Sequence, residues 1–379
     1  MKKIDIPFNI PPVLGVELEY LNQVLINKKI CGDGPFTYKC RDWFIKELGV
    51  PSALLTTSCT SALEMCAVLL DLEEGDEIIM PSYTFVSSAL AFVMNGAKIV
   101  FVDIDPKTMN IDPDCIEAAI TPKTKAIVAV HYAGVSCDMN RILDIGAKYN
   151  LRIIEDAAQG MMSKYNGKHL GSIGDLGSYS FHETKNFTCG EGGLLLINNK
   201  KFTERAEILR EKGTNRSKFF RGQVDKYTWV DKGSSWLPSE LNAAYLYSQL
   251  ENSEIINTNR LNSWNLYYSL LLDLQNKGFI TLPFIPDNCI HNAHMFYIKV
   301  KNLDERTNLT EYLLNKGIQT VFHYIPLHSS PGGIKYGRFH GDDIFTTIES
   351  ERLLRLPMFY GLTQDQIQYI CKSIEDFFL

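Results

Sequence analysis

The chain has 379 residues, a length that favours two domains or one large domain with an appendage. Apolar residues make up 45% and charged residues 22%, a balance typical of soluble proteins with a buried core. The net charge of -6 argues against a function in binding nucleic acids or anionic membranes. A local basic pocket for a phosphorylated ligand stays compatible with that charge.

The nine cysteines form no CxxC pair, and their odd number argues against a complete disulfide framework. A reduced, cytoplasmic protein is therefore the simplest interpretation. The first residues contain no apolar run long enough for a signal peptide. No stretch approaches the roughly 18 uninterrupted apolar residues of a membrane span, so we expect no membrane partner.

The first half of the chain alternates between strand and helix patterns. Strands are expected at residues 54–57, 77–81, 98–103, 125–131 and 151–156. Helices are expected before and between them, at residues 17–27, 36–48, 62–72, 84–94, 112–120 and 138–149. Such repetition predicts a mostly parallel sheet covered on both faces. Ligands of these sheets bind where the strands end, which here means residues 82–85, 131–132 and 156–159.

The second half follows a different pattern. Two more strands, at residues 178–181 and 194–198, are followed by the helices expected at residues 204–212, 238–250, 255–276, 309–316 and 364–378. Further extended segments are expected at residues 278–282, 294–300 and 319–323. This pattern predicts a large domain over residues 1–250 and a small α+β domain over residues 251–379.

A lysine, Lys185, lies on the polar turn between the strands at residues 178–181 and 194–198. A lysine on such a turn is most often a solvated surface charge. The alternative is a Schiff-base lysine that holds a cofactor at the end of a strand. The choice between the two depends on which groups the rest of the chain can bring to the same place.

Two other features favour the cofactor interpretation. Residues 58–61 read Ser-Cys-Thr-Ser before an apolar helix, where hydroxyls and free N–H groups either cap the helix or bind an anion. Asp156 ends a buried strand, where its carboxylate is either a hydrogen-bond anchor or a partner for a cationic ring. Pyridoxal phosphate needs a phosphate cradle, a carboxylate for its ring nitrogen and a lysine for its aldehyde. Phe85, just after a strand, is placed to stack on the ring.

Several motifs, taken together, are specific for one protein family. The chain is similar to the DegT/DnrJ/EryC1/StrS sugar-aminotransferase family over its whole length, through Asp156-Ala157-Ala158-Gln159, Thr184-Lys185-Asn186, Gly190-Glu191-Gly192-Gly193, Pro81-Ser82-Tyr83-Thr84-Phe85 and Tyr324-Ile325-Pro326-Leu327-His328. The resemblance implies an α/β protein with the PLP-dependent aspartate aminotransferase fold (type I), with a mostly parallel sheet in the large domain and a small α+β C-terminal domain. It also implies a homodimer with shared active sites.

The resemblance implies that pyridoxal 5'-phosphate is the cofactor, and it assigns roles to single residues. The catalytic residues are Lys185, which bonds the cofactor, and Asp156, which faces the ring nitrogen. Gln159 is expected to bind the ring hydroxyl and Phe85 to stack. The phosphate is expected to be held by Ser58, Cys59, Thr60 and Ser180.

One motif departs from the family pattern. Many relatives have Gly-x-Asn-x-Arg where this chain has Gly233-Ser234-Ser235-Trp236-Leu237. Ser235 would stand in for the asparagine that reaches the partner subunit's phosphate, with a shorter side chain and a bridging water. Leu237 cannot replace the charge of the arginine.

That departure is similar to one branch of the family. Its members transfer the amino group of L-glutamate to C4 of TDP-4-keto-6-deoxyglucose, giving TDP-4-amino-4,6-dideoxygalactose for surface polysaccharides such as enterobacterial common antigen or the O-antigen of lipopolysaccharide. The C4 epimer, a C3 aminotransferase and another nucleotide stay open. A dehydratase is disfavoured because those relatives carry histidine at the position of Lys185. A regulator that kept the fold is the non-enzyme alternative.

Five residues are candidates for binding the substrate. Arg216 and Arg221 belong to a basic, aromatic stretch at residues 215–229, which is either a solvated loop or a contact for the nucleotide's pyrophosphate. Tyr324 and His328 are either core residues of the small domain or neighbours of the sugar. His182 precedes the lysine turn. No histidine or cysteine spacing predicts a metal site.

Overall fold

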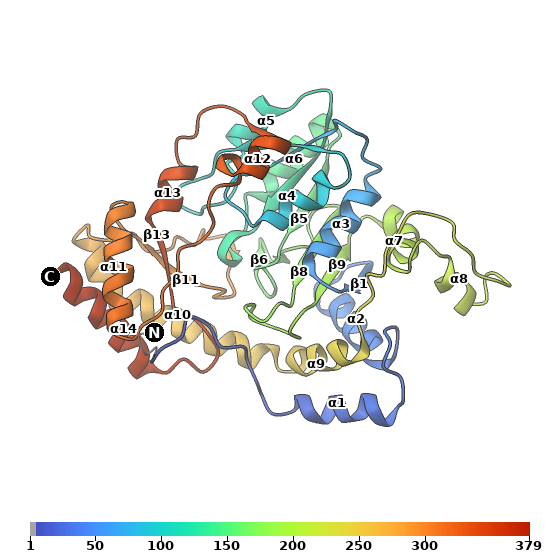
Figure 1. Ribbon diagram of the computed structural model, residues 1–379, viewed down its shortest axis with the longest axis horizontal. Helices are drawn as coiled ribbons and strands as arrows, with labels where there is room; N and C mark the ends of the chain where they lie inside the picture. The colour runs from blue at the N-terminus through green and yellow to red at the C-terminus, as the bar shows by residue number, and fades with distance from the viewer. Residues whose placement is uncertain (1–4) are drawn as a thin grey trace.

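Eight strands form a central sheet within residues 5–379, which the computed structural model describes (Figure 1). Their order across the sheet is β1 (Ser52–Thr56), β9 (Gly193–Ile197), β8 (Leu176–Ser180), β5 (Arg152–Asp156), β4 (Thr124–Val130), β2 (Glu77–Pro81), β3 (Lys98–Val102) and β12 (Gly337–Phe339). Only β9 runs antiparallel to its neighbours, β1 and β8. The predicted mostly parallel sheet is confirmed.

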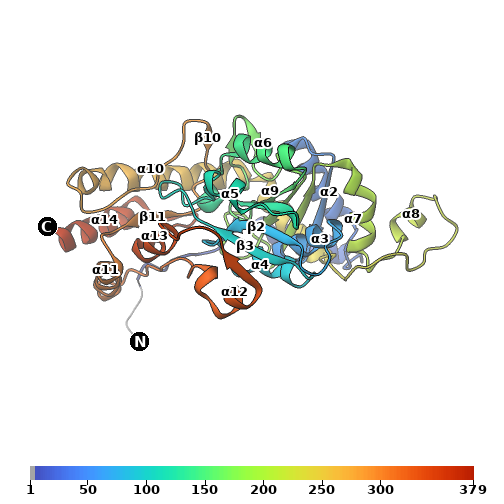
Figure 2. The ribbon, with the colours of Figure 1, turned by 90° about the horizontal axis from the view of Figure 1, so that it is seen from above.

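Helices cover both faces of this sheet, as its continuous apolar strands require. One core contains residues of α2 (Pro35–Leu48), α5 (Asp114–Ala119), α6 (Met139–Tyr149) and α9 (Glu240–Glu251). The core on the other face contains residues of α3 (Cys59–Leu69), α4 (Val86–Val93) and α7 (Thr203–Arg210). Figure 2 shows α6 and α4 on opposite sides of β2 and β3.

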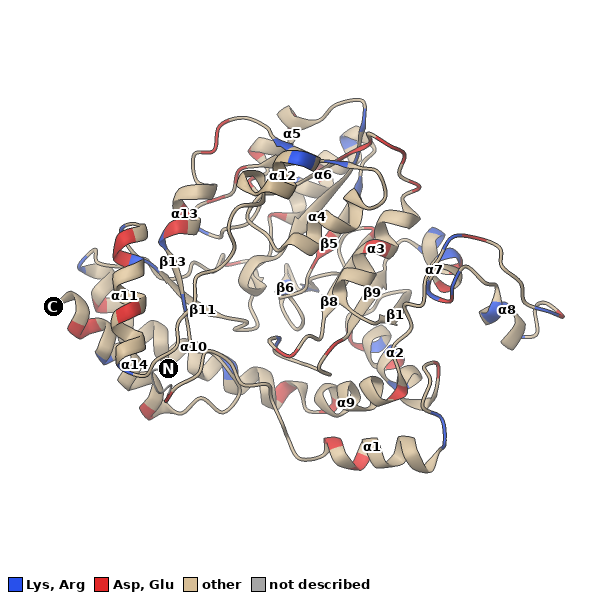
Figure 3. Cartoon of the chain, viewed as in Figure 1, with Lys and Arg blue, Asp and Glu red and all other residues tan. Residues whose placement is uncertain are grey.

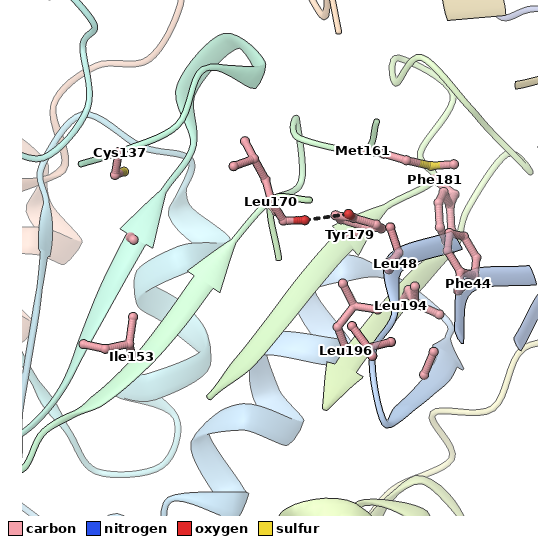
Figure 4. Packing of buried hydrophobic residues seen from close by; sticks show 14 of the residues in the cluster. Phe44, Leu48, Cys137, Ile153, Met161, Leu170, Tyr179, Phe181, Leu194 and Leu196 are labelled. Atoms are coloured by element: carbon pink, nitrogen blue, oxygen red, sulfur yellow. Dashed lines mark hydrogen bonds between the residues drawn. The ribbon is translucent and has the colours of Figure 1, made fainter. Parts of the chain in front are cut away.

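Aromatic packing fixes the end of β8, from which the chain enters the Lys185 turn. The ring of Phe44 lies 5.7 Å from that of Phe181 and 6.2 Å from that of Tyr179, measured between centroids. Tyr179 donates a 2.6 Å hydrogen bond to the carbonyl of Leu170 (Figure 4). Because Tyr179 and Phe181 are fully buried, the strand before the turn is firmly positioned.

The C-terminal part packs around a core of its own. It contains α10 (Ser253–Asn276), α11 (Leu303–Asn315), α14 (Gln364–Phe378) and the antiparallel pair β11 (Phe296–Lys299) and β13 (Leu353–Leu356). Strand pairings cross residue 250 at three places: β12 joins the large sheet beside β3, Cys289 pairs with Tyr165, and Ile6 pairs with Ile318. The domain division at residue 250 stays a prediction.

Smaller elements complete the fold. They are α1 (Glu17–Ile26), α8 (Arg216–Phe220), α12 (Pro331–Tyr336), α13 (Thr346–Arg352), the 3-10 turns at Tyr132–Gly134, Lys200–Phe202 and Leu327–Ser329, and a small sheet of β10 (Cys289–Ile290), β6 (Lys164–Tyr165) and β7 (Lys168–His169). In Figures 1 and 2, α8 lies on a loop that projects from the body of the molecule.

Several predicted elements differ from the structure: for example, the extended segment expected at 278–282 is reduced to a bridge between Thr281 and Lys299. Two further differences have local reasons. The helix expected at 309–316 begins at Leu303, because the side chain of Asn302 accepts a 3.0 Å hydrogen bond from the amide of Glu305 and caps it. The strand expected at 319–323 is reduced to a single bridge between Val321 and Arg355. Tyr324 then turns the chain with a φ of 44°.

Residues 5–379 lack three features: a membrane-spanning helix, a disulfide bond and a cluster of metal-binding side chains. No helix there combines the length and apolarity needed to cross a membrane. The nine cysteines, all within this range, are free thiols. In the same range, His, Cys, Asp and Glu side chains nowhere gather in threes that suit a metal ion.

Candidate active site

A cavity of about 730 Å³ opens where β5 and β8 end. Asp156 and Ser180 are the last residues of those strands, so the cavity lies at the strand ends where ligands of such sheets bind. Ten of the residues singled out in the sequence line it: Ser58, Cys59, Thr60, Phe85, Asp156, Gln159, Ser180, His182, Lys185 and Tyr324. Residues as far apart in the chain as Phe8 and Arg355 therefore converge on one site.

The N-terminus of α3 forms one wall. Ser58 is the extended N-cap residue, and its Oγ accepts a 3.0 Å hydrogen bond from the amide of Ser61. The amides of Cys59 and Thr60 are first-turn donors without a carbonyl partner inside the helix. A Cβ on Gly193 would lie 2.2 Å from the carbonyl carbon of Ser58, so this close approach requires glycine. Spare donors and the positive helix end suit a phosphate.

The carboxylate of Asp156 is buried and held on both oxygens. Oδ2 accepts a 2.6 Å hydrogen bond from the hydroxyl of Ser88, and Oδ1 accepts a 3.2 Å bond from the amide of Ala158. Two oxygens offer about four acceptor positions, so capacity remains for a further N–H donor. This arrangement fits a protonated ring nitrogen.

Lys185 extends from the turn into the cavity. Its backbone amide donates a 2.9 Å hydrogen bond to the carbonyl of His182, which fixes the turn. Within residues 5–379, its ammonium group has no hydrogen-bond or ion-pair partner. Burial lowers the pKa of Lys185, and the nearby Cys59 and Asp156 offset part of that effect. A lysine with a lowered pKa supplies more of the neutral amine that attacks an aldehyde.

Gln159 and Tyr324 meet above this centre. The side-chain amide of Gln159 donates a 3.0 Å hydrogen bond to the hydroxyl of Tyr324, while its oxygen accepts a 2.6 Å bond from the amide of Ala133. The ring of Tyr324 lies 6.1 Å from that of Phe85. Burial raises the pKa of Tyr324, so its hydroxyl stays protonated. Phe85 is 56% exposed, which leaves its face open for stacking.

Four predicted site residues lie outside the cavity lining in this single chain. Arg216 pairs with Glu211 at 3.4 Å and Arg221 with Glu207 at 2.8 Å. Figure 3 shows charges of both signs on α7 and on the loop that carries α8. Ser235 is exposed on the segment that follows this loop.

His328 is the fourth residue outside the lining. Its Nδ1 lies 2.7 Å from the hydroxyl of Ser82, and its Nε2 lies 3.2 Å from a carboxylate oxygen of Asp343. His182 differs, because it lines the cavity with its Nε2 3.7 Å from a carboxylate oxygen of Glu191. His328 therefore sits behind the site, while His182 faces it.

Other residues line the cavity although their sequence context did not single them out, among them Phe8, His294, His323 and Arg355. The clearest available signal was Arg355, a charge inside the apolar run Leu353-Leu354-Arg355-Leu356. A charged residue in a buried strand needs a partner or a function. The two histidines gave no such signal, since each lies among ordinary polar and apolar neighbours.

The model of the DegT/DnrJ/EryC1/StrS aminotransferase family matches residues 15–375. The chain belongs to this family. Among curated relatives, GDP-perosamine synthase of Escherichia coli O157:H7 is 31% identical over 374 residues, with 98% of each chain covered. An uncharacterized protein of Methanocaldococcus jannaschii is 35% identical over 350 residues, with 90% of each covered.

Solved structures of aminotransferases superpose along nearly the whole chain. The aminotransferase TlmJ from Streptoalloteichus hindustanus has a TM-score of 0.90 and 25% identity, with 98% of each chain covered. A Streptococcus pneumoniae protein named as a sugar aminotransferase, solved in its PLP form, has a TM-score of 0.88 and 26% identity, with 98% of each covered. The fold is therefore the type I fold of PLP-dependent aminotransferases, as predicted.

These matches make pyridoxal 5'-phosphate the cofactor of this aminotransferase. The residues present fit it: a helix N-terminus with spare donors for the phosphate, a buried carboxylate with spare acceptor capacity, and an unpaired lysine, all on one cavity. The residues therefore fit the cofactor in chemistry as well as in shape, because each of these three groups meets a separate chemical requirement of pyridoxal phosphate.

Proposed function

We propose that this protein transfers the amino group of L-glutamate to C4 of TDP-4-keto-6-deoxyglucose and so makes TDP-4-amino-4,6-dideoxygalactose for a surface polysaccharide. The observation that carries the transaminase assignment is the convergence of Lys185, Asp156 and the start of α3 on one cavity. A sugar acceptor is supported by the names of two relatives, a GDP-perosamine synthase and a sugar aminotransferase. The resemblance of Gly233-Ser234-Ser235-Trp236-Leu237 to one branch of the family supports C4 and the TDP carrier.

Bound pyridoxal phosphate supplies an aldehyde that takes up the amino group and a ring that withdraws electrons from the reacting carbon. The start of α3, with Ser58, Cys59 and Thr60, would bind the phosphate together with Ser180. Asp156 would hold the proton on the ring nitrogen. Ser88, which donates to Asp156 at 2.6 Å, keeps that carboxylate in place.

Lys185 would act twice. It would bond the aldehyde carbon until a substrate amine displaces it, and the released amine would then move a proton at the carbon that gains or loses the amino group. Its lowered pKa suits both tasks, since the neutral form is the base and the nucleophile. Gln159 would bind the ring hydroxyl, and Phe85 would stack on the ring and exclude water from that face.

The substrate would be bound by residues on two sides of the cavity mouth. His182 and Tyr324 line the cavity and would contact the sugar, while His328 would act through its hydrogen bond with Ser82. The loop that carries Arg216 and Arg221 projects from its own chain (Figure 1). We propose that it reaches the pyrophosphate of a nucleotide sugar in the pocket of a second copy, where Ser235 would approach the cofactor's phosphate.

The second candidate is an aminotransferase of a GDP-linked 4-keto sugar. It is favoured by the 31% identity to GDP-perosamine synthase over 98% of each chain. The C4 epimer and a C3 product are further outcomes of the same chemistry, because the cofactor accepts any ketone that the pocket orients correctly.

One experiment separates these candidates. The PLP-loaded protein is incubated with L-glutamate and either TDP-4-keto-6-deoxyglucose or its GDP counterpart, and the products are examined by NMR. We expect an axial C4 amine from the TDP sugar, with kcat/KM at least about tenfold above that for the GDP sugar. A preference for the GDP sugar supports the second candidate, and no product from either rejects both.

A further inference from the structure

Arg355 also lines the cavity. It comes from the C-terminal part of the chain and not from the strand ends of the large sheet, which would hold the cofactor. It lies on β13, whose other residues are leucines, and Leu354 and Leu356 on either side of it are buried. Its backbone pairs with Val321, close to the turn at Tyr324. The arginine is thus the cationic group that the small C-terminal core presents to the cavity.

The guanidinium of Arg355 has no counter-ion among the residues that the structure describes. Its Nε is buried without a hydrogen-bond partner in residues 5–379, and no carboxylate in that range lies within ion-pair distance. The guanidinium instead lies 4.5 Å from the centroid of the Phe8 ring. Burial lowers the pKa of Arg355, and the neighbouring Tyr132 and Tyr324 act in the opposite direction.

A second buried arginine shows what a purely structural role looks like here. Arg260 is 1% exposed and donates to the carbonyls of Ala293, His294 and Met358 at 3.1, 2.7 and 3.3 Å. Buried charges are normally satisfied in this way. Within residues 5–379, Arg355 has no such carbonyl partners and lines the cavity instead.

We propose that Arg355 binds a carboxylate of the amino donor. This inference rests on the proposed aminotransferase function and deepens it by naming the group that selects an amino acid as donor. A guanidinium offers two parallel donors that match a carboxylate, and the pairing is strongest in a site that excludes water. The carboxylate of the bound donor would then be the counter-ion of the Arg355 guanidinium.

The chemistry of the two substrates favours the donor over the sugar nucleotide. The α-carboxylate of an amino acid is attached to the carbon that carries the amino group, so it must lie beside Lys185 during transfer. Arg355 and Lys185 line the same cavity, so a donor bound there can reach both side chains. In a 4-keto sugar nucleotide, by contrast, the sugar ring separates the pyrophosphate from the reacting carbon.

The test compares Arg355→Gln and Arg355→Lys with the wild-type protein, all loaded with PLP. Arg338→Gln is the matched control, because Arg338 is an exposed arginine of the same part of the chain and pairs with Glu77. Spectral titration gives the half-saturating concentration of L-glutamate in one half-reaction and of the amino-sugar nucleotide in the other. Glutarate, a dicarboxylate that cannot react, is titrated by calorimetry.

We expect Arg355→Gln to raise the half-saturating glutamate concentration and the glutarate Kd by about tenfold to a hundredfold, with less than about a threefold change for the amino sugar. Arg355→Lys should fall between, and Arg338→Gln should match wild type. Unchanged glutamate and glutarate values, or equal losses for both substrates, would overturn the proposal. If wild type transfers no amino group, the proposed function fails, and the glutarate titration still decides the role of Arg355.

Discussion

The cavity at the strand ends and the loop that carries α8 were both predicted to bind substrates, but their charged side chains differ in whether they are already paired. In the cavity, Lys185 and Arg355 have no carboxylate partner within residues 5–379, although both are largely enclosed. On the loop, Arg216 and Arg221 already pair with Glu211 and Glu207. Charges kept unpaired at an energetic cost indicate a ligand by themselves, whereas paired surface charges need a second observation to do so.

The two regions also differ in how rigidly they are built. The cavity residues extend from buried strands and capped helix ends, so their positions follow from the core. The loop exposes Phe220 by 69% and Trp229 by 78%. Exposed aromatic side chains of that size favour a contact with another molecule, which supports our proposal that the loop reaches the pocket of a second copy.

The comparison predicts its largest effect at Lys185. Lys185→Ala should lower kcat by about a thousandfold or more, because it removes both the bond to the cofactor and the proton carrier. Borohydride reduction followed by mass spectrometry should find the cofactor attached at Lys185 in wild type and at no residue in the variant. Substantial turnover by the variant would contradict the assignment.

Asp156 should come next. Asp156→Asn keeps the shape but loses the charge that holds the proton on the ring nitrogen, so kcat should fall by about tenfold to a hundredfold. Ser88→Ala should cost only a few-fold, since it removes one of two hydrogen bonds to that carboxylate. Steady-state kinetics check both, and a larger loss for Ser88→Ala than for Asp156→Asn would reverse the assigned roles.

The loop should give a smaller and selective effect. Arg216→Ala and Arg221→Ala should each raise the KM for the nucleotide sugar by about threefold to tenfold while leaving that for L-glutamate unchanged, because a rim arginine contacts only the pyrophosphate. Lys218→Ala, on the same loop and paired with Glu204, is the control. Equal KM changes for both substrates would show that the loop is only a solvated surface.

The smallest effect concerns stability. Because burial lowers the pKa of Lys185 below its usual value of 10.5, the unfolded chain binds the proton more tightly than the folded protein. The contribution of Lys185 to stability therefore rises as the pH increases from its folded pKa towards 10.5 and is lost as the pH falls through the folded pKa. Urea unfolding of the cofactor-free protein should show this rise relative to Lys185→Met, and parallel pH curves would contradict it.

The sequence predicted the sheet and most of the cavity for physical reasons. Strand–helix alternation and strand-end polar residues such as Asp156 are local patterns, and Lys185 became specific through the motifs around it. Arg355 and His323 were missed because they reach the cavity through the tertiary pairing of β13 and the turn at Tyr324. Likewise, β12 has only three residues and forms by pairing with β3, which no local pattern indicates.

The enclosed cavity that contains the unpaired Lys185 is proposed to be the site of amino transfer. The most direct measurement adds L-glutamate to the PLP-loaded protein and follows the visible absorbance together with the release of 2-oxoglutarate. We predict a loss of the visible band with one 2-oxoglutarate per cofactor, abolished in Lys185→Ala. An unchanged spectrum with no 2-oxoglutarate released from the wild-type protein would contradict the claim.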